Sequence, residues 1–403
     1  MSFVIERKVI PVDKSKDSLG VESFVSVRFG GAIEPRDLDE DPSYKGSLFW
    51  ADAGDLIYSK IDCRNGAIGI VPNEFTRVAV TSEFPVYRVR REVVVPEFIR
   101  RVFQTRHFMD YINGMVSGAS GRKRVQPVEL ESVSIPVPSK AIQEAIVKQW
   151  KVTEQSISAA RAVLDESVRE LDEWLLTKTD ISLFANPWLA LDWNAITRWD
   201  VKTARAAAFR LSNPNFVPFG YYAEEATALA KPQLELDKDW PIYGVNNTEG
   251  VFFSQFQKGA EFNTGYKRIK KDWFFHNPTR SAVGSLGIVP EVPDDAITSP
   301  EYQVWRLRDL GEESLLPQFV ATLIRTSWFI KLIQFHRVGA VKQRLYVENL
   351  LEIPVPRFPR DLQKRIAAAR ISALEKLAAA KKRSEIVKEE VEEMILGTRP
   401  VEV

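Results

Sequence analysis

The spacing of hydrophobic positions between residues 140 and 178 predicts one long helix. The segment contains neither Pro nor Gly, and Pro136, Pro138 and Pro187 flank it. Its apolar and small residues recur at alternating steps of three and four, a coiled-coil seam rather than the broad apolar face of a globular helix. The seam consists of Trp150, Thr153, Ile157, Ala160, Leu164, Ser167, Leu171 and Trp174.

A second segment with the same pattern, residues 360 to 396, predicts another long helix. The phrase Ile-Pro-Val-Pro precedes both segments, at 135–138 and 353–356, and Gln143 and Gln363 follow it. At about 1.5 Å per residue, each helix would be roughly 55 to 60 Å long, which exceeds a small domain. The second seam consists of Ile366, Arg370, Ala373, Leu377, Ala380, Ser384, Val387, Val391 and Met394.

The segment before the first long helix is rich in predicted strands. Short β-branched and aromatic runs occupy 24–27, 55–58, 68–71 and 86–89, and glycine-containing turn signals separate them. An amphipathic helix is predicted over 96–108, and a basic loop follows at 118–125.

The same order of features recurs at an offset of about 217 to 221 residues, which indicates an internal duplication. The matched pairs are 69–72 with 287–290, 81–84 with 298–302, 96–98 with 317–319, 105–108 with 326–329, and 118–124 with 339–344. We therefore predict an α+β chain with two strand-rich domains in tandem and two long helices. Along the sequence these are domain 1 (1–139), a central helix (140–180), domain 2 (181–358) and a C-terminal helix (359–403).

Composition narrows the function classes. The chain has 403 residues, 45% hydrophobic and 27% charged, with a formal net charge of +1. No run of eighteen apolar residues exists, and the N-terminus lacks the basic-then-apolar order of a signal peptide. The single cysteine, Cys63, excludes an intrachain disulfide and fits a reducing cytoplasm. One cysteine and three histidines are too few for a Cys/His metal site to be expected. We expect a cytoplasmic protein that contacts no membrane and whose nucleic-acid binding, if any, relies on local basic patches.

Motifs for catalysis are largely missing. The sequence has no Gly-rich phosphate loop, no dinucleotide fingerprint and no Ser nucleophile on a G-x-S-x-G elbow. The run His276-Asn-Pro-Thr279 is only distantly similar to the Asn-Pro-Pro-aromatic motif of adenine methyltransferases, and no Gly-rich adenosylmethionine loop accompanies it. We therefore predict no catalytic residue, no cofactor and no metal bound by this chain.

Basic clusters recur at matching places in both copies, and this recurrence favours a function over ordinary surface. Lys and Arg in loops neutralise phosphates, and Arg reads guanine bidentately. Asn246 and Asn247 could read adenine or form a turn, and the turn is favoured. The predicted DNA-binding residues are Lys60, Arg64, Arg122, Lys123, Arg124, Lys267, Arg268, Arg280, Lys342 and Arg344.

This ordered set of motifs resembles the specificity (S) subunit of type I restriction–modification systems. The resemblance includes the strand phrase at 54–60, the Gly-Ile-Val-Pro strands, the Thr-Ser-(Pro)-Glu-aromatic segments, the Gly-Ala-basic loops and the Ile-Pro-Val-Pro phrases with their Gln and long helix. It implies that each domain is a target recognition domain for one half of a bipartite site in double-stranded DNA. The long helices would pair as an antiparallel coiled coil that separates the half-sites.

The resemblance also implies partners. Methyltransferase subunits would bring S-adenosylmethionine for adenine methylation, and an ATP-dependent restriction subunit, with ATP and Mg, would cleave DNA. The chain itself would be non-catalytic. Two alternatives stay open on the residues alone: a coiled-coil protein–protein scaffold that reads no DNA, and an enzyme with an unrecognised site.

Overall fold

The structure is a computed structural model that describes residues 1–13, 15–17, 19–20, 23–36, 46–115, 124–178, 194, 204, 215–339 and 341–400. The chain divides into two compact units, Met1–Ile157 with Ala378–Val403, and Ser158–Leu377. The division runs through both long helices. Each unit therefore contains one strand-rich domain together with about half of each long helix. The ranges predicted from the sequence instead treat each long helix as a segment separate from the domains.

Both long helices extend over the predicted residues. Helix α4 spans Lys140–Lys178 and helix α9 spans Arg360–Leu396. Every predicted seam position is buried or half-buried, as the alternating steps of three and four require. The seam prediction is confirmed.

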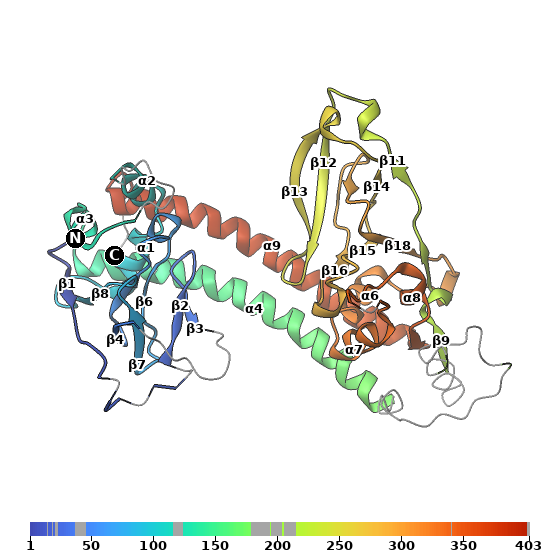
Figure 1. Cartoon of the computed structure of the whole chain (residues 1–403), viewed down its shortest axis with the longest axis horizontal. Helices are drawn as coiled ribbons and strands as arrows, with labels where there is room; N and C mark the ends of the chain where they lie inside the picture. Colours follow the sequence, from blue (N-terminus) through green and yellow to red (C-terminus); the bar gives the residue numbers. More distant parts are fainter. Residues whose placement is uncertain are drawn as a thin grey trace. The chain divides into compact units, whose positions relative to one another are not determined.

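The two helices run antiparallel to each other within each unit (Figure 1). In unit 1, Gln149 Nε2 of α4 donates to Glu390 Oε2 of α9 (2.9 Å). In unit 2, Arg365 of α9 forms an ion pair with Glu170 of α4. Residue numbers thus fall along α9 as they rise along α4, which is the antiparallel order. No helix in the described part of the chain is long and apolar enough to cross a membrane.

Unit 1 is built on a four-stranded antiparallel sheet with the strand order β1-β8-β5-β6. Two separate antiparallel pairs, β2–β3 and β4–β7, complete its strands. The predicted single helix over 96–108 is wrong, because the chain breaks between α1 and α2, where the Thr105 hydroxyl accepts from Phe108 N–H (3.2 Å). The elements are β1 (Ile5–Lys8), β2 (Val25–Val27), β3 (Ile33–Pro35), β4 (Leu48–Asp52), β5 (Leu56–Tyr58), η2 (Cys63–Asn65), β6 (Ile68–Ile70), β7 (Arg77–Thr81), β8 (Val86–Val89), α1 (Pro96–Val102), α2 (Arg106–Met115) and α3 (Pro127–Ser132).

Unit 2 repeats this sheet as β10-β18-β15-β16, with the same order and the same antiparallel pairing. It adds a five-stranded sheet of order β11-β14-β17-β12-β13 and a β9–β19 pair. The shared sheet order agrees with the duplication inferred from sequence. The elements are β9 (Phe216–Pro218), η5 (Phe219–Tyr221), β10 (Ala223–Glu225), β11 (Leu229–Ala230), η6 (Pro232–Leu234), β12 (Asp239–Asn246), β13 (Gly250–Lys258), η7 (Gly259–Glu261), β14 (Tyr266–Arg268), β15 (Phe274–His276), η8 (Ser281–Val283), β16 (Leu286–Ile288), β17 (Ile297–Thr298), β18 (Gln303–Leu307), η9 (Gly311–Glu313), α6 (Pro317–Leu323), α7 (Ser327–His336), α8 (Val347–Leu351) and β19 (Pro354–Pro356).

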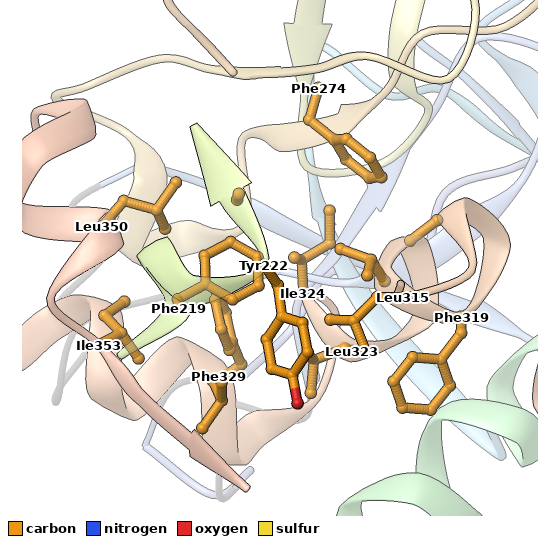
Figure 2. Close-up of a cluster of buried hydrophobic side chains, with 14 of the residues drawn as sticks. Phe219, Tyr222, Phe274, Leu315, Phe319, Leu323, Ile324, Phe329, Leu350 and Ile353 are labelled. Atoms are coloured by element: carbon orange, nitrogen blue, oxygen red, sulfur yellow. The ribbon is translucent and has the colours of Figure 1, made fainter. Parts of the chain in front are cut away.

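The main core of each unit includes side chains from both long helices. In unit 2, aromatic and aliphatic residues of η5, β15, α6, α7 and α8 pack together (Figure 2), and Leu171 and Leu175 of α4 and Ile366 of α9 belong to the same cluster. In unit 1 the corresponding contributions come from Trp150 of α4 and Val391 of α9. Burying these side chains fixes each helix against its domain.

A buried glutamine joins each long helix to the domain that precedes it. Gln143 Oε1 accepts from Val95 N–H (2.7 Å), while its Nε2 donates to Val93 O (3.3 Å) and Pro138 O (2.8 Å). In unit 2, Gln363 Oε1 accepts from Leu316 N–H (3.2 Å) and its Nε2 donates to Phe358 O (3.1 Å). Val95 and Leu316 are the N-cap residues of α1 and α6. In each unit, the side-chain amide of one glutamine thus binds a backbone group at the start of a short helix and another just before the long helix.

A carboxylate at the far end of each long helix binds the other domain. Asp172 of α4 accepts from Trp328 N–H (2.8 Å) and Ser327 Oγ (2.6 Å) at the start of α7. Glu392 of α9 accepts from His107 N–H (2.7 Å) at the start of α2. A negative charge at a helix N-terminus is favourable, because free N–H groups and the helix dipole point at it. Each domain is thus held by the start of one long helix and the end of the other.

We expect Gln143→Leu to destabilise unit 1 because it leaves half-buried backbone groups without partners. Each group left unsatisfied costs about 1–3 kcal/mol. Urea unfolding of the full-length variant measures the loss. Gln155→Leu is the matched control, since Gln155 lies on the same helix and is exposed. Equal effects of the two substitutions would show that the Gln143 hydrogen bonds contribute nothing.

Candidate nucleic-acid interface

In both units a tight turn follows the same strand of the shared sheet. The turn after β5 contains Lys60 and leads into η2, and the turn after β15 leads into η8. Each 3-10 helix ends on a glycine in the left-handed region, Gly66 (φ 84°) and Gly284 (φ 87°). A side chain is strained at such a φ, so these glycines fix where the turn returns to the sheet.

The predicted basic loops end beside these turns. Val125 N–H donates to Lys60 O (2.8 Å) in unit 1, and Leu345 N–H donates to Pro278 O (3.0 Å) in unit 2. The hydrogen bonds are at corresponding places of the two copies. The structure therefore joins the turn and the described end of the loop in each unit, and we call this surface the loop face.

A buried side chain anchors the end of each loop. Tyr58 OH donates to Val125 O (3.2 Å), and His276 Nε2 donates to Leu345 O (2.9 Å). Burial lowers the pKa of His276 to about 4, so the imidazole is neutral at pH 7. His276, the first residue of the His-Asn-Pro-Thr run, thus orients the loop from inside the domain.

The loop face of unit 2 is cationic. Arg280 and Lys342 are exposed and Arg344 is half-buried, and none of the three forms an ion pair with a carboxylate in the described part of the chain. Arg337 was not predicted from the sequence. Its Nη2 donates to Gln343 O (2.8 Å) and Thr279 O (3.4 Å) and so ties the loop to the turn. Its position two residues before Gly339, where the predicted basic loop begins, could have identified it as part of the same basic cluster.

In the described part of the loop face of unit 1, one cation is paired with a carboxylate. Arg124 Nε lies 3.3 Å from Glu83 Oε2, and Glu83 O accepts from Lys60 N–H (3.0 Å). Arg64 lies in η2 and is half-buried. The predicted residues Arg122 and Lys123 lie outside the described residues.

Lys267 and Arg268 lie on β14 of the five-stranded sheet and not on the turns or loops that hold the other predicted residues. Lys267 Nζ donates to Tyr302 O (2.7 Å), and burial lowers its pKa. The Arg268 guanidinium lies over the Trp240 ring, 5.9 Å from its centroid. Lys267 therefore contacts the segment directly before β18 of the shared sheet, whereas Arg268 contacts Trp240 of β12 in its own sheet.

Other candidate residues have local structural roles. Asn246 Oδ1 accepts from Thr248 N–H (3.0 Å) and Glu249 N–H (2.6 Å), so the prediction of a turn there is confirmed. Cys63 is buried, and burial raises the pKa of its thiol to about 12. Within the described ranges, no group of three or more His, Cys, Asp or Glu side chains is placed to hold a metal ion.

The buried His276 predicts a specific acid sensitivity. Its folded pKa of about 4 lies below its ordinary value of 6.5, so the unfolded chain takes up the proton first as the pH falls. Stability is therefore lost between pH 6.5 and 4, by on the order of 3 kcal/mol. We expect His276→Gln, which retains a donor for Leu345 O but cannot titrate, to lose less stability over this range in urea unfolding. The exposed His107, changed to Gln, is the control and should keep the wild-type profile.

Comparison with known proteins gives matches among solved structures. No family model matches the sequence, and no curated protein matches it. The HsdS subunit from Thermoanaerobacter tengcongensis is 15% identical over 98% of this chain and 93% of its own, with a TM-score of 0.31. The type I restriction-modification S subunit from M. genitalium is 12% identical over 100% of this chain and 95% of its own, with a TM-score of 0.48.

A third match comes from a structure that describes complex assembly and conformational transition of the type I R-M system. It is 14% identical over 98% of this chain and 96% of its own, with a TM-score of 0.35. These three structures, each similar to this chain along nearly its whole length, are thus components of type I restriction–modification systems.

Proposed function

We propose that this chain is the DNA-specificity subunit of a type I restriction–modification complex. Each unit reads one half of a bipartite site through its loop face, and the two long helices set the distance between the half-sites. The chain performs no chemistry itself. Methyltransferase and ATP-dependent restriction subunits methylate adenine or cleave DNA at the places that it selects.

The observation that carries this proposal is the recurrence of the loop face. In both units, a basic loop ends against the turn after the same sheet strand, through the corresponding backbone hydrogen bond. Loops that carry Lys and Arg position a protein on phosphates and reach base edges in a groove. Two such surfaces on one chain match a site with two halves, because tandem modules that engage one duplex gain avidity.

The helix pair is suited to setting a fixed distance. A flexible linker gives a broad distribution of end-to-end distances, whereas a helix advances a fixed ~1.5 Å per residue. Gln143 and Gln363 tie each helix start to its own domain. A change in helix length is therefore expected to alter the spacing of half-sites and leave the bases read by each domain unchanged.

A groove between α4 and α9 in unit 1 supports a role in assembly. It has a volume of about 1030 Å³, and charged side chains of both signs line it, among them Glu144, Lys148, Arg383 and Glu390. A groove of this size on paired helices, with apolar and charged side chains in its lining, is suited to a protein partner, and in this proposal the partner is a methyltransferase subunit. A scaffold that reads no DNA would use the same groove. A measurement of DNA binding is therefore needed to distinguish a specificity subunit from a scaffold.

DNA binding is tested by electrophoretic mobility with the methyltransferase partner present. We expect a bipartite site, and binding that is strictly independent of sequence would refute the proposal. The triple variant Arg280→Gln, Lys342→Gln, Arg344→Gln should weaken binding about tenfold or more, since each lost phosphate contact lowers the salt dependence and the affinity. It should also relax recognition of one half-site and retain the other.

The matched control removes three positive charges elsewhere. Lys376, Lys381 and Lys382 are exposed on α9, and their triple change to Gln leaves both loop faces intact. We expect near wild-type binding from this control. Equal losses in the two triple variants would indicate a general charge effect and would count against the loop face as the reading surface.

Helix length gives an independent test. Seven added residues after Ile157 and seven after Leu377, where the two units divide, preserve the heptad seam in both helices. They lengthen the pair by about 10 Å, which corresponds to about three base pairs of DNA. We expect methylome sequencing to show the same two half-sites with about three more base pairs between them. An unchanged spacing would show that the helices do not set it.

A further inference from the structure

Strands β12 and β13 form a long two-stranded ribbon in unit 2 that exposes a pair of aromatic side chains (Figure 1). β13 is an edge strand of the five-stranded sheet, since the strand order ends at β17-β12-β13. Phe253 and Phe256 on this strand are 47% and 64% exposed, whereas Phe274 and Phe275 of the shared sheet are fully buried. An exposed apolar patch on a folded protein marks an interaction surface.

The two rings belong to one fixed cluster. The ring centroids of Phe253 and Phe256 lie 5.0 Å apart, and the Tyr243 ring of β12 packs edge-on against Phe253 at 5.7 Å. A register shift between Ile242 and Tyr243 brings residues three apart on β13 together, which strict alternation of side chains would prevent. The cluster therefore presents one apolar surface rather than a single ring that could insert between stacked bases.

The start of β13 is fixed to the turn of the loop face. Arg325 Nη1 donates to Asn247 O (2.9 Å) in the β12–β13 turn and to Gly284 O (3.0 Å), the C-cap of η8. Gly287 of β16 allows a close approach, because a Cβ there would lie 3.0 Å from Val251 N of β13. A duplex bound at the loop face of unit 2 would thus lie beside the start of the ribbon.

Unit 1 has the same junction with a shorter ribbon. Gln104 Nε2 donates to Gly30 O in the β2–β3 turn, and a Cβ on Gly69 of β6 would meet Gly31 O. β2 and β3 have three residues each, whereas β12 has eight and β13 has nine. Within the described ranges, the long ribbon therefore distinguishes unit 2 from unit 1 and can give it different base contacts.

β13 carries no carboxylate that phosphates would repel. Its sequence, Gly-Val-Phe-Phe-Ser-Gln-Phe-Gln-Lys, contains one charged residue, Lys258, and Asp239 lies opposite Lys258 across the ribbon. A nearly neutral, partly apolar strand suits the base edges inside a groove, where apolar side chains contact thymine methyl groups. The cations of the loop face suit the phosphates, which position a protein without reading sequence.

We propose that the Phe253–Phe256 pair reads thymine in the half-site of unit 2, by apolar contact with the C5-methyl group in the major groove. This groove admits a two-stranded β-ribbon, and Phe is among the side chains that contact the thymine methyl group there. The inference rests on the proposed function above and adds specificity-determining residues to it. It assigns base reading to the ribbon and phosphate contacts to the loop face.

The test removes the methyl group from the DNA and the ring from the protein. The full-length chain, with its methyltransferase partner, is titrated with fluorescent duplexes that carry the bipartite site found by methylome sequencing. In each duplex one thymine of the site is replaced by uracil, which pairs with adenine in the same way and lacks only the C5-methyl group. We expect a replacement in one half-site to weaken wild-type binding about fourfold, the effect of exposing one buried methyl group. Phe256→Ser should bind the thymine and uracil duplexes equally, at the weaker affinity.

Leu229→Ser is the matched control. Leu229 is 60% exposed on β11, the opposite edge strand of the same sheet, so this change removes a similar apolar surface elsewhere. The control should distinguish the two duplexes as the wild type does. Phe256→Ser should also keep the wild-type slope of log K against log salt, because it removes no phosphate contact. A smaller slope would show that the substitution alters docking on the phosphates, and it would count against base reading.

The remaining outcomes separate this inference from the proposed function. A uracil effect that persists in Phe256→Ser would show that another group reads the methyl group, which overturns the inference. Specific binding by the wild type without any uracil effect would refute the inference alone, whereas sequence-independent binding would refute the proposed function with it. Analytical ultracentrifugation tests a different occupant of the edge strand. A wild-type dimer that Phe256→Ser abolishes would assign the pair to contacts with a second copy of the chain and overturn the inference.

Discussion

Buried amide side chains fix the two long helices to the domains that precede them. Gln143 and Gln363 each accept from the N-cap N–H of a short helix and donate to the carbonyl two residues before the long helix begins. These backbone groups lie at helix starts, where no helical partner is available to the N–H groups. An apolar residue at either position would leave them without these partners. The position of each long helix thus depends on one side chain with a donor and an acceptor at its end.

The far ends of the helices impose a second constraint. Asp172 and Glu392 accept from backbone N–H groups at the starts of α7 and α2, so each helix ends on the domain that it does not begin from. The division into units at Ile157 and Leu377 follows from this exchange. It also couples the two helices. A length change in one of them alone would move its terminal carboxylate out of reach, and only equal changes in both preserve all four attachments.

Much of this fold could be predicted from the sequence, because its periodic features are strong. The bounds of α4 and α9 and their seams followed from the proline flanks and the alternating steps. The break between α1 and α2 was missed, since no Pro or Gly marks it. Thr105 and Thr326, three residues before Phe108 and Phe329, were an N-cap signal that the pattern of apolar residues obscured.

The candidate site was predictable only in part. Recurrence identified the loops and turns that the structure joins in each unit. Lys267 and Arg268 also precede a Gly-Ile-Val-Pro strand, but they belong to the five-stranded sheet of unit 2, and distance along the sequence cannot tell one sheet from another. Arg325 and Arg337 interact with backbone carbonyls that only the folded chain brings near.

Comparison of the two copies also explains how the surface charge of the two units could become different. Tyr58 and the neutral His276 each donate to a loop carbonyl, whereas the neutral Gln104 and the positively charged Arg325 each donate to a turn carbonyl. Since the backbone requires one donor at each place and does not require a particular charge, the two units keep one framework while presenting different electrostatic surfaces. In the proposed function, that freedom is what allows two copies of one domain to read two different half-sites.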